Sequence, residues 1–269
     1  MKRLILLILI FPLQLFAQKA ELPKLFHPFI VIAHRGDHTK APENSLKAYQ
    51  NAISEGVDFI EIDLRTTKDQ KLVIMHDASV DRMTGTAGII SQMTLKELKE
   101  LKIRDAKHPE WGSYSIPTFE EVLKLCKNKI NIYLDFKDAS AKAAYDLICK
   151  TGMQHQFIVY INNEKQFEDW RNIAPQVPLM ISLPQKVSNY EELKKVIQQY
   201  HPDILDGSYD EYNYETVAAA KKLQIPVWPD IQSENEANNW ETALSLGFKG
   251  LQTDHPIALI NFLKEHHLR

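Results

Sequence analysis

The sequence of 269 residues contains only two cysteines, Cys126 and Cys149, so it can form at most one intramolecular disulfide. Each cysteine lies near the apolar face of a predicted helix, where a cysteine is more often a buried free thiol than half of a bridge. An oxidising compartment would allow the two to pair, but pairing needs a geometry that a sequence does not reveal. We expect two free thiols, with a single disulfide as the alternative.

A long hydrophobic run is also lacking. The longest apolar stretch, Leu4–Phe16, is broken by a proline and a glutamine and is shorter than the roughly 20 residues of a membrane-spanning helix. It follows two basic residues and leads to Ala17, which is the layout of a secretory signal peptide. No cysteine lies near this position, which argues against a lipid anchor. We therefore predict a signal peptide at residues 1–17 and an exported mature chain, periplasmic or secreted, without stable membrane insertion.

An excess of positive charge is absent as well. The formal net charge of the whole sequence is −3 at pH 7, and removing the two positive charges of Lys2 and Arg3 with the signal peptide makes it −5. A mildly acidic chain gives no electrostatic reason to expect nucleic acid binding. The sequence also has no low-complexity segment, internal repeat or Pro/Gly-rich linker, so we expect residues 18–269 to form a single domain.

What the sequence does contain is a strongly patterned stretch, Val57–Asp77. Read as a strand, its first half places Glu61, Asp63 and Arg65 on one face and apolar residues on the other. Side chains two apart on a strand lie about 6–7 Å apart at Cα, so both carboxylates can reach one hard cation. A second apolar run then leads to His76, which a short polar link would bring back beside the carboxylates. The alternative is an ordinary half-exposed ribbon with solvated charges.

Strands and helices alternate along the rest of the chain. Setting aside the second run of the ribbon at 71–75, eight apolar runs read as strands, each followed by a helical pattern. This arrangement favours an α/β fold, a (β/α)₈ TIM barrel with a small insertion after strand 2 at about residues 66–116. A doubly wound open sheet is the alternative. The predicted strands are 29–33, the first half of Val57–Asp77, 130–136, 157–161, 178–183, 203–207, 225–229 and 249–253.

In such a barrel the catalytic groups lie at the carboxyl ends of the strands. His34 follows the first predicted strand, Glu61 and Asp63 end the second, and Asp135 and Lys137 end the third. Neighbouring strands would therefore bring three acids, a lysine and a histidine to one mouth of the barrel. This convergence favours a functional site over scattered surface charges.

Five sequence blocks carry a resemblance to a known family. They are His34-Arg35-Gly36, Pro42-Glu43-Asn44-Ser45, Glu61-x-Asp63, Thr67-Lys68-Asp69 and His76-Asp77 with Arg82 close behind. In this order and spacing the chain resembles the glycerophosphodiester phosphodiesterases. The similarity continues, more loosely, through Asp135-x-Lys137 and Thr253-Asp254-x-Pro256.

The resemblance implies a TIM-barrel hydrolase, metal-dependent in most members, that splits glycerophosphodiesters such as glycerophosphocholine into sn-glycerol 3-phosphate and an alcohol. It assigns general acid/base catalysis to His34 and His76, without deciding which of them acts first as the base. The metal ligands that it implies are Glu61, Asp63 and Asp135, and the phosphate contacts are Arg35 and Lys137.

Two positions depart from the family pattern. Asp135 stands where the family usually has glutamate, which shortens the third ligand by one methylene, or about 1.5 Å of reach. The residues from Trp228 to Ile231 replace the usual Trp-Thr-Val-Asn, and a proline among them removes a backbone donor. We expect Trp228 to form part of the substrate-binding wall, with packing in the core as the alternative.

Three carboxylate ligands suit Ca²⁺ or Mg²⁺, and Ca²⁺ is favoured because it is accessible outside the cytoplasm and tolerates irregular geometry. Two other functions stay open. One is a phosphodiesterase that acts on intact lipid, of the phospholipase C or sphingomyelinase D kind, and the other is a barrel that binds phosphodiesters without cleaving them. Other histidines, including His38, read as surface or structural residues, and Asp254 reads first as part of a helix start.

Overall fold

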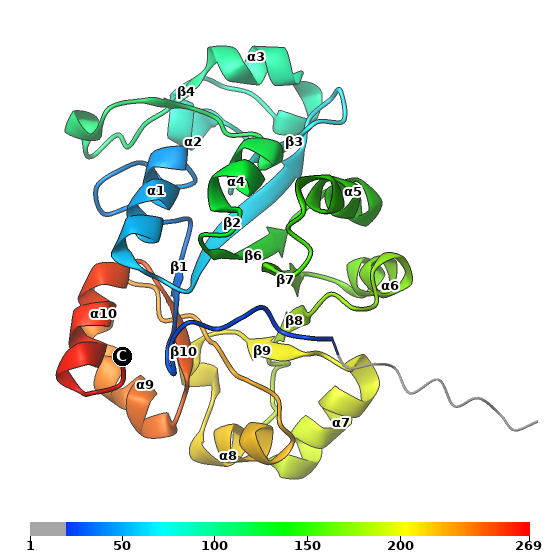
Figure 1. The fold of residues 1–269 in the computed structure, drawn as a ribbon, viewed down its shortest axis with the longest axis vertical. Coiled ribbons are helices and arrows are strands. Elements are labelled where there is room, and N and C mark those ends of the chain that lie inside the picture. Colours follow the sequence, from blue (N-terminus) through cyan, green and yellow to red (C-terminus); the bar gives the residue numbers. More distant parts are fainter. Residues whose placement is uncertain (1–19) are drawn as a thin grey trace, which may run out of the picture.

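The computed structural model describes residues 20–269, so the signal peptide predicted at residues 1–17 lies outside the described residues. Within the described range, strands and helices alternate around a curled and mostly parallel sheet (Figure 1). Among the helices of residues 20–269, none is both long and apolar enough to cross a membrane.

Seven strands follow one another across the central sheet and pair in parallel. In spatial order they are β10 (Gly250–Thr253), β1 (Ile30–Ala33), β2 (Phe59–Thr66), β6 (Asn131–Phe136), β7 (Phe157–Ile161), β8 (Leu179–Ser182) and β9 (Ile204–Asp206). The register of β2 and β6 places Asp63 beside Asp135 and Glu61 beside Tyr133. Two acids from neighbouring strands therefore lie side by side, as the barrel hypothesis predicts.

The strand predicted at 225–229 is present only as isolated bridges. Parallel bridges connect Val227 to β9 and Asp230 to β10, so this segment joins the two edges of the sheet and completes a ring. Pro226 and Pro229 lack the N–H groups that a continuous ladder requires. The predicted (β/α)₈ barrel is confirmed, with its seventh strand reduced by the two prolines.

The helices pack around the outside of the ring (Figure 1). Polar side chains cap the N-termini of most of these helices; for example, the Thr118 side chain accepts from the backbone N–H of Glu121 in a capping box. The helices around the ring are α1 (Leu46–Glu55), α4 (Phe119–Cys126), α5 (Ala141–Thr151), α6 (Glu164–Ile173), α7 (Tyr190–Tyr200), α8 (Tyr214–Lys222), α9 (Trp240–Leu246) and α10 (Pro256–Glu265).

The chain between β2 and α4 builds a small unit at one end of the barrel, at the top of Figure 1. It begins with β3 (Leu72–Ile74), which pairs antiparallel with β2 as predicted for the ribbon. Its buried apolar side chains, such as Val73, Met83 and Ile103, form a cluster of their own. The other elements of this unit are α2 (Asp81–Thr84), α3 (Leu95–Glu100), β4 (Lys102–Ile103) and β5 (Tyr114–Ser115).

Apolar side chains fill both faces of the sheet. The larger cluster lies between the strands and the surrounding helices. A smaller cluster, which includes Ile32, Phe59, Tyr133 and Trp228, draws its residues from strands all around the ring and fills its interior. The barrel is therefore a packed core below its mouth, and a ligand can enter only from the strand ends.

Both cysteines are free thiols, as expected from the sequence. Cys126 is buried on α4, where burial raises the pKa of its thiol to about 12, and Cys149 on α5 is partly exposed. A buried thiol with a raised pKa is a packing residue rather than a nucleophile.

Candidate active site

One cavity at the carboxyl ends of the strands collects seven of the eight predicted site residues. Its volume is about 280 Å³. The predicted residues that line it are His34, Arg35, Glu61, Asp63, His76, Asp135 and Lys137, and Tyr133, Tyr160, Asn162, Asp206, Asp230, Gln232 and Gln252 complete its wall.

Three carboxylates form a group that suits a hard cation. Oxygen atoms of Glu61, Asp63 and Asp135 all lie within 4.8 Å of one another. Burial, together with the neighbouring carboxylates of Asp63 and Asp135, raises the pKa of Glu61 well above its usual value. The negative charge of the three carboxylates thus exceeds the positive charge around them, and every candidate ligand atom is an oxygen. Both properties fit a Ca²⁺ or Mg²⁺ ion.

Two positively charged side chains face these carboxylates. Lys137 Nζ lies 3.2 Å from Asp63 Oδ1 and also donates to Asp135, and Arg35 Nε lies 3.7 Å from Asp63 Oδ2. Burial opposes the charge of Lys137, but the carboxylates of Asp63 and Asp135 outweigh it and raise the pKa of the ammonium. Burial likewise opposes the ionisation of Asp63, but Lys137 and Arg35 outweigh it and lower its pKa. Lys137, Arg35 and Asp63 are therefore charged near neutral pH.

The loop after β1 is held in a backbone conformation that aims its groups at the carboxylates. Arg35 and Gly36 both adopt left-handed conformations, with φ of 52° and 82°. A Cβ atom at position 36 would lie 2.8 Å from Tyr49 Cδ1, so only glycine fits there. This turn lets the backbone N–H of Arg35 donate to Glu61 Oε2 at 2.8 Å. This left-handed turn thereby positions one of the three acids.

The next loop residue of interest, Asn44, supports a second acid. Its amide donates to Asp63 Oδ2 at 2.7 Å and accepts a hydrogen bond from the Tyr49 hydroxyl at 2.6 Å. Ser45, not Asn44, is the N-cap of α1. Asn44 therefore orients a carboxylate of the site and does not cap the helix.

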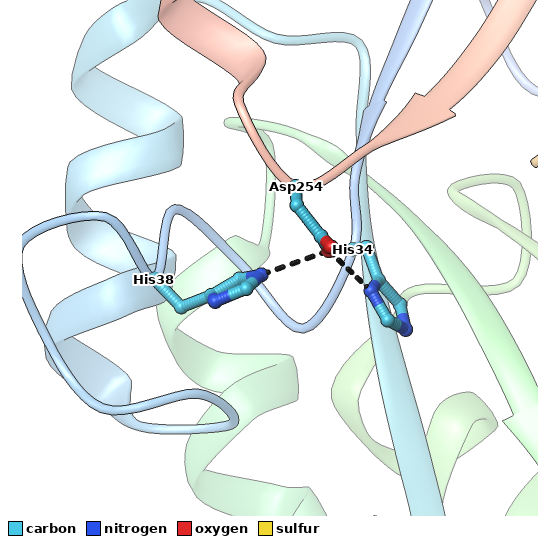
Figure 2. A group of neighbouring side chains, drawn as sticks. All are labelled: His34, His38 and Asp254. Carbon is cyan, nitrogen blue, oxygen red and sulfur yellow. Dashed lines mark hydrogen bonds and ion pairs between the residues drawn. The ribbon is translucent and has the colours of Figure 1, made fainter. Parts of the chain in front are cut away.

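His34 belongs to a group of three side chains that meet at one carboxylate oxygen (Figure 2). His34 Nδ1 donates to Asp254 Oδ1 at 2.7 Å, and His38 Nε2 lies 3.0 Å from the same oxygen. With Nδ1 engaged, the other ring nitrogen of His34 is left for the cavity, which His34 lines. Burial lowers the pKa of His34, although the hydrogen bond to Asp254 opposes this shift. The neutral imidazole is therefore favoured, which suits a general base.

His76 is held in a parallel way from the other side of the cavity. Its Nδ1 donates to Asp77 Oδ1 at 2.7 Å, and Arg82 Nε donates to Asp77 Oδ2 at 2.7 Å. Arg82 also donates twice to Glu43, at 2.8 and 2.9 Å, and Glu43 accepts from Arg35 at 3.0 Å. A chain of alternating charges thus links His76 to the loop after β1. Both predicted catalytic histidines have an aspartate that fixes their orientation.

Trp228 is the one predicted site residue that the structure does not bring to the cavity. Its side chain is only 2% exposed and belongs to the apolar cluster inside the ring. Its ring lies 5.4 Å from that of Phe59, and it packs so closely on Gly250 that a Cβ atom there would overlap it. The expected substrate contact is corrected to a packing role, because the bridge register of the seventh segment turns Trp228 inward below the mouth.

The sequence interpretation missed several residues of the site. His38 and Asp254, read as structural, lie directly behind His34. Asp206 and Gln252 were not considered at all, yet both line the cavity. Their signal was a polar residue at the carboxyl end of an otherwise apolar predicted strand, the same signal that identified Asp135.

Comparisons with known proteins agree with this geometry. The model of the glycerophosphoryl diester phosphodiesterase family matches residues 34–258. The glycerophosphodiester phosphodiesterase of Caldanaerobacter subterraneus is 28% identical over 249 residues, which cover 88% of this chain and 98% of the relative. The glycerophosphodiester phosphodiesterase of Bacillus subtilis is 25% identical over 252 residues, covering 84% of each chain.

Solved structures share the fold. A glycerophosphodiester phosphodiesterase from Agrobacterium tumefaciens matches with a TM-score of 0.73 and 22% identity, covering 85% of this chain and 98% of that one. A phosphodiesterase from Oleispira antarctica, solved with the product sn-glycerol-3-phosphate, matches with a TM-score of 0.74 and 22% identity, covering 87% and 96%. By its sequence blocks, its barrel and the match over most of its length, the chain belongs to the glycerophosphoryl diester phosphodiesterase family.

Proposed function

We propose that this protein is an exported, metal-dependent phosphoric diester hydrolase that cleaves glycerophosphodiesters into sn-glycerol 3-phosphate and an alcohol. Family membership supports the reaction class. The observation that carries the proposal is the pairing of two histidines, each oriented by an aspartate, with a group of three carboxylates in one cavity of about 280 Å³. Acid/base groups and a cation site within one cavity are the parts that phosphodiester cleavage requires.

Charge complementarity places the phosphate between the positively charged groups. Lys137 and Arg35 line the cavity, and Arg35 Nε is buried without a hydrogen bond partner in the described residues. Both side chains can donate to phosphate oxygens and stabilise the charge that grows on them in the transition state. Glu61, Asp63 and Asp135 would hold Ca²⁺, or alternatively Mg²⁺, which when bound supplies further positive charge to the same oxygens.

The two histidines divide the proton transfers. His34, whose neutral form is favoured by burial, takes the proton from the attacking oxygen as its bond to phosphorus forms. His76, which is more exposed, gives a proton to the leaving alkoxide as the second phosphorus–oxygen bond breaks. The attacking oxygen is that of water or of the glycerol hydroxyl next to the ester, the latter giving a cyclic phosphate that water then opens. Asp254 and Asp77 hold the rings in position throughout.

Export is the part of the proposal that rests on residues 1–17 alone. Their basic start, apolar run and small residue at position 17 support a cleaved signal peptide and a periplasmic or secreted enzyme. That location favours Ca²⁺ among the two candidate ions. Mass spectrometry of the mature protein purified from outside the cytoplasm, with its N-terminus at or near residue 18, is the expected result. A protein that starts at Met1 would contradict the proposal.

The activity is tested by release of glycerol 3-phosphate from glycerophosphocholine and glycerophosphoethanolamine. The mature protein is stripped with a chelator and then supplied with Ca²⁺ or Mg²⁺. We expect activity to vanish on stripping, to return with one of the ions, and to be lost in His34→Ala and His76→Ala. His155→Ala serves as the matched control, because His155 is exposed just before the amino end of β7 and does not line the cavity. A folded, metal-supplied protein without turnover would refute the function.

A further inference from the structure

The group of His34, His38 and Asp254 in Figure 2 contains one imidazole more than the proposed proton transfers use. Asp254 orients His34 through the hydrogen bond from Nδ1, and this role needs no second histidine. His38 lies in the loop between β1 and α1, and its Nε2 is 3.0 Å from the same Asp254 oxygen. The two rings are nearly perpendicular, at 80°, with centroids 6.1 Å apart. Two imidazole nitrogens and a carboxylate oxygen therefore converge on one point.

These three side chains have the spacing of metal ligands. Like the three carboxylates of the cavity, they offer ligand atoms that all lie within 4.8 Å of one another. Zn²⁺ binds imidazole nitrogen and carboxylate oxygen at about 2.0–2.2 Å in a tetrahedron, which separates neighbouring ligand atoms by about 3.3 Å. The nitrogens of His34 and His38 lie 2.7 and 3.0 Å from Asp254 Oδ1. Replacing the two protons at these contacts by one ion would widen the separations by only about 0.3–0.6 Å.

An ion from solvent has access to this group. The side chains of His34, Asp254 and His38 are 16%, 24% and 25% exposed, so all three are partly open to solvent. The neighbouring cation, Arg35, is already paired with Glu43 at 3.0 Å, which limits its repulsion of a bound ion. The group is therefore accessible, and its carboxylate brings negative charge to a divalent cation.

The ligand atoms select a different ion from the one proposed for the carboxylate group. Ca²⁺ and Mg²⁺ are bound through oxygen, whereas imidazole nitrogen suits Zn²⁺. Two of the three ligand atoms of His34, His38 and Asp254 are nitrogens, while those of the carboxylate group are all oxygen. His34 belongs to the first group and also lines the cavity that contains the second. A zinc ion bound by His34 would therefore act on catalysis without occupying the calcium or magnesium site.

We propose that His34, His38 and Asp254 form an inhibitory Zn²⁺ site that switches off the catalytic base. Without zinc, His34 carries its proton on Nδ1 and leaves the lone pair of Nε2 for the cavity. Zinc takes the lone pair of Nδ1, so the neutral ring carries its single proton on Nε2, transferred through solvent. Nε2 then has no lone pair to accept the proton of the attacking oxygen. His38 likewise binds zinc through Nε2 and carries its proton on Nδ1.

Binding is tested by calorimetric titration of the mature protein with Zn²⁺ in an excess of Ca²⁺, which occupies the carboxylate group. His38→Gln keeps a side-chain N–H that can donate to Asp254 but removes the imidazole ligand, and His38→Phe removes both. We expect one zinc site in the wild type and an affinity at least about tenfold lower in each variant. His108→Ala removes an exposed histidine beside Glu110 and should bind zinc as the wild type does. Wild-type affinity in both His38 variants would overturn the site.

The proton position on His34 is a readout that needs no turnover. The ¹⁵N chemical shifts of an imidazole ring identify which nitrogen carries the proton. In the wild type we expect the His34 proton to lie on Nδ1 before zinc is added and on Nε2 afterwards, whereas His38→Gln should keep it on Nδ1 throughout. A His34 ring that binds zinc and retains its proton on Nδ1 would overturn the switch.

Inhibition is measured on glycerophosphocholine hydrolysis with Ca²⁺ in excess, and this part of the proposal rests on the proposed function. Zinc should inhibit the wild type and His108→Ala. In His38→Gln and His38→Phe, each compared with its own rate without zinc, the inhibition constant should rise at least about tenfold. Inhibition that more Ca²⁺ relieves and that both His38 variants retain would place zinc on the carboxylate group and overturn the proposal. If no hydrolysis occurs at all, the function fails, while calorimetry and the ring shifts still decide whether the zinc site exists.

Discussion

Replacement of Asp254 by asparagine tests whether the group in Figure 2 serves catalysis. The carboxylate accepts from His34 Nδ1 at 2.7 Å, and this bond becomes charge-assisted when His34 takes up a proton. Hydrogen bonds to charged groups contribute about 1.5–3 kcal/mol, which corresponds to a factor of about 10–150 in rate. We expect Asp254→Asn to lower kcat by this factor with little change in KM, because the phosphate contacts remain.

The assay is steady-state hydrolysis of glycerophosphocholine across pH. The hydrogen bond to Asp254 raises the pKa of His34, so its loss lowers that pKa further. His34 is then neutral down to a lower pH, and the acidic limb of the kcat/KM profile should move to lower pH while the plateau falls. His38→Phe, which removes only the neighbouring ring, should leave Asp254 bonded to His34 and cost less.

Two results would refute this reasoning. One is an unchanged kcat in a folded Asp254→Asn variant. The other is a fall in kcat that persists at the same size in a His34→Ala background, since a residue that acts through His34 should have no further effect once His34 is gone.

Three further predictions concern stability. Burial and the nearby carboxyl of Asp37 raise the pKa of Glu55 from 4.5 to about 7, so the folded state retains a proton that the unfolded chain releases, and stability falls as pH rises across this range. Glu55→Gln should therefore raise the free energy of unfolding at pH 8 by about 1 kcal/mol, allowing for solvent screening, and not at pH 4; equal gains at both pH values in urea titrations would contradict this. Arg269→Met removes a 2.6 Å ion pair to the fully buried Asp58 and should cost about 3 kcal/mol in the same assay, whereas a change under about 0.5 would show the pair to be dispensable. Trp228→Phe should lower the melting temperature but leave KM within about twofold, and a large rise in KM at unchanged stability would restore the substrate contact that the packing excludes.

The sequence predicted the barrel because its signals were local. Apolar runs such as Phe29–Ala33 mark buried strands, and the capping box at Thr118 marks a helix start whatever the tertiary context. The alternation of Glu61 and Asp63 predicted that both face the same way, and the cavity contains both. Patterns that extend over only a few residues determine local structure in much the same way wherever the segment lies in the fold.

The errors came from properties that only the closed ring determines. Pro226 and Pro229 were visible in the sequence, but their effect on the seventh strand depends on which of its N–H groups the neighbours need. Whether Trp228 faces the mouth or the core below it depends on the register of that same segment. His38 and Asp254 are 216 residues apart in the chain. No local pattern could therefore predict that His34 and His38 both contact the same oxygen atom of Asp254.

The ring divides into two arcs that are joined differently. On one side β1, β2 and β6 form a continuous ladder beneath the groups proposed for chemistry, whereas the other side closes through the isolated bridges around 225–231. Pro226 and Pro229 break the ladder of that second arc into separate bridges, and the arc carries Asp206 and Asp230 of the cavity wall. Mutations there can accumulate without moving the carboxylates on β2. Substrate choice can thus drift over evolutionary time, or be redirected by protein engineering, while the cleavage reaction is preserved.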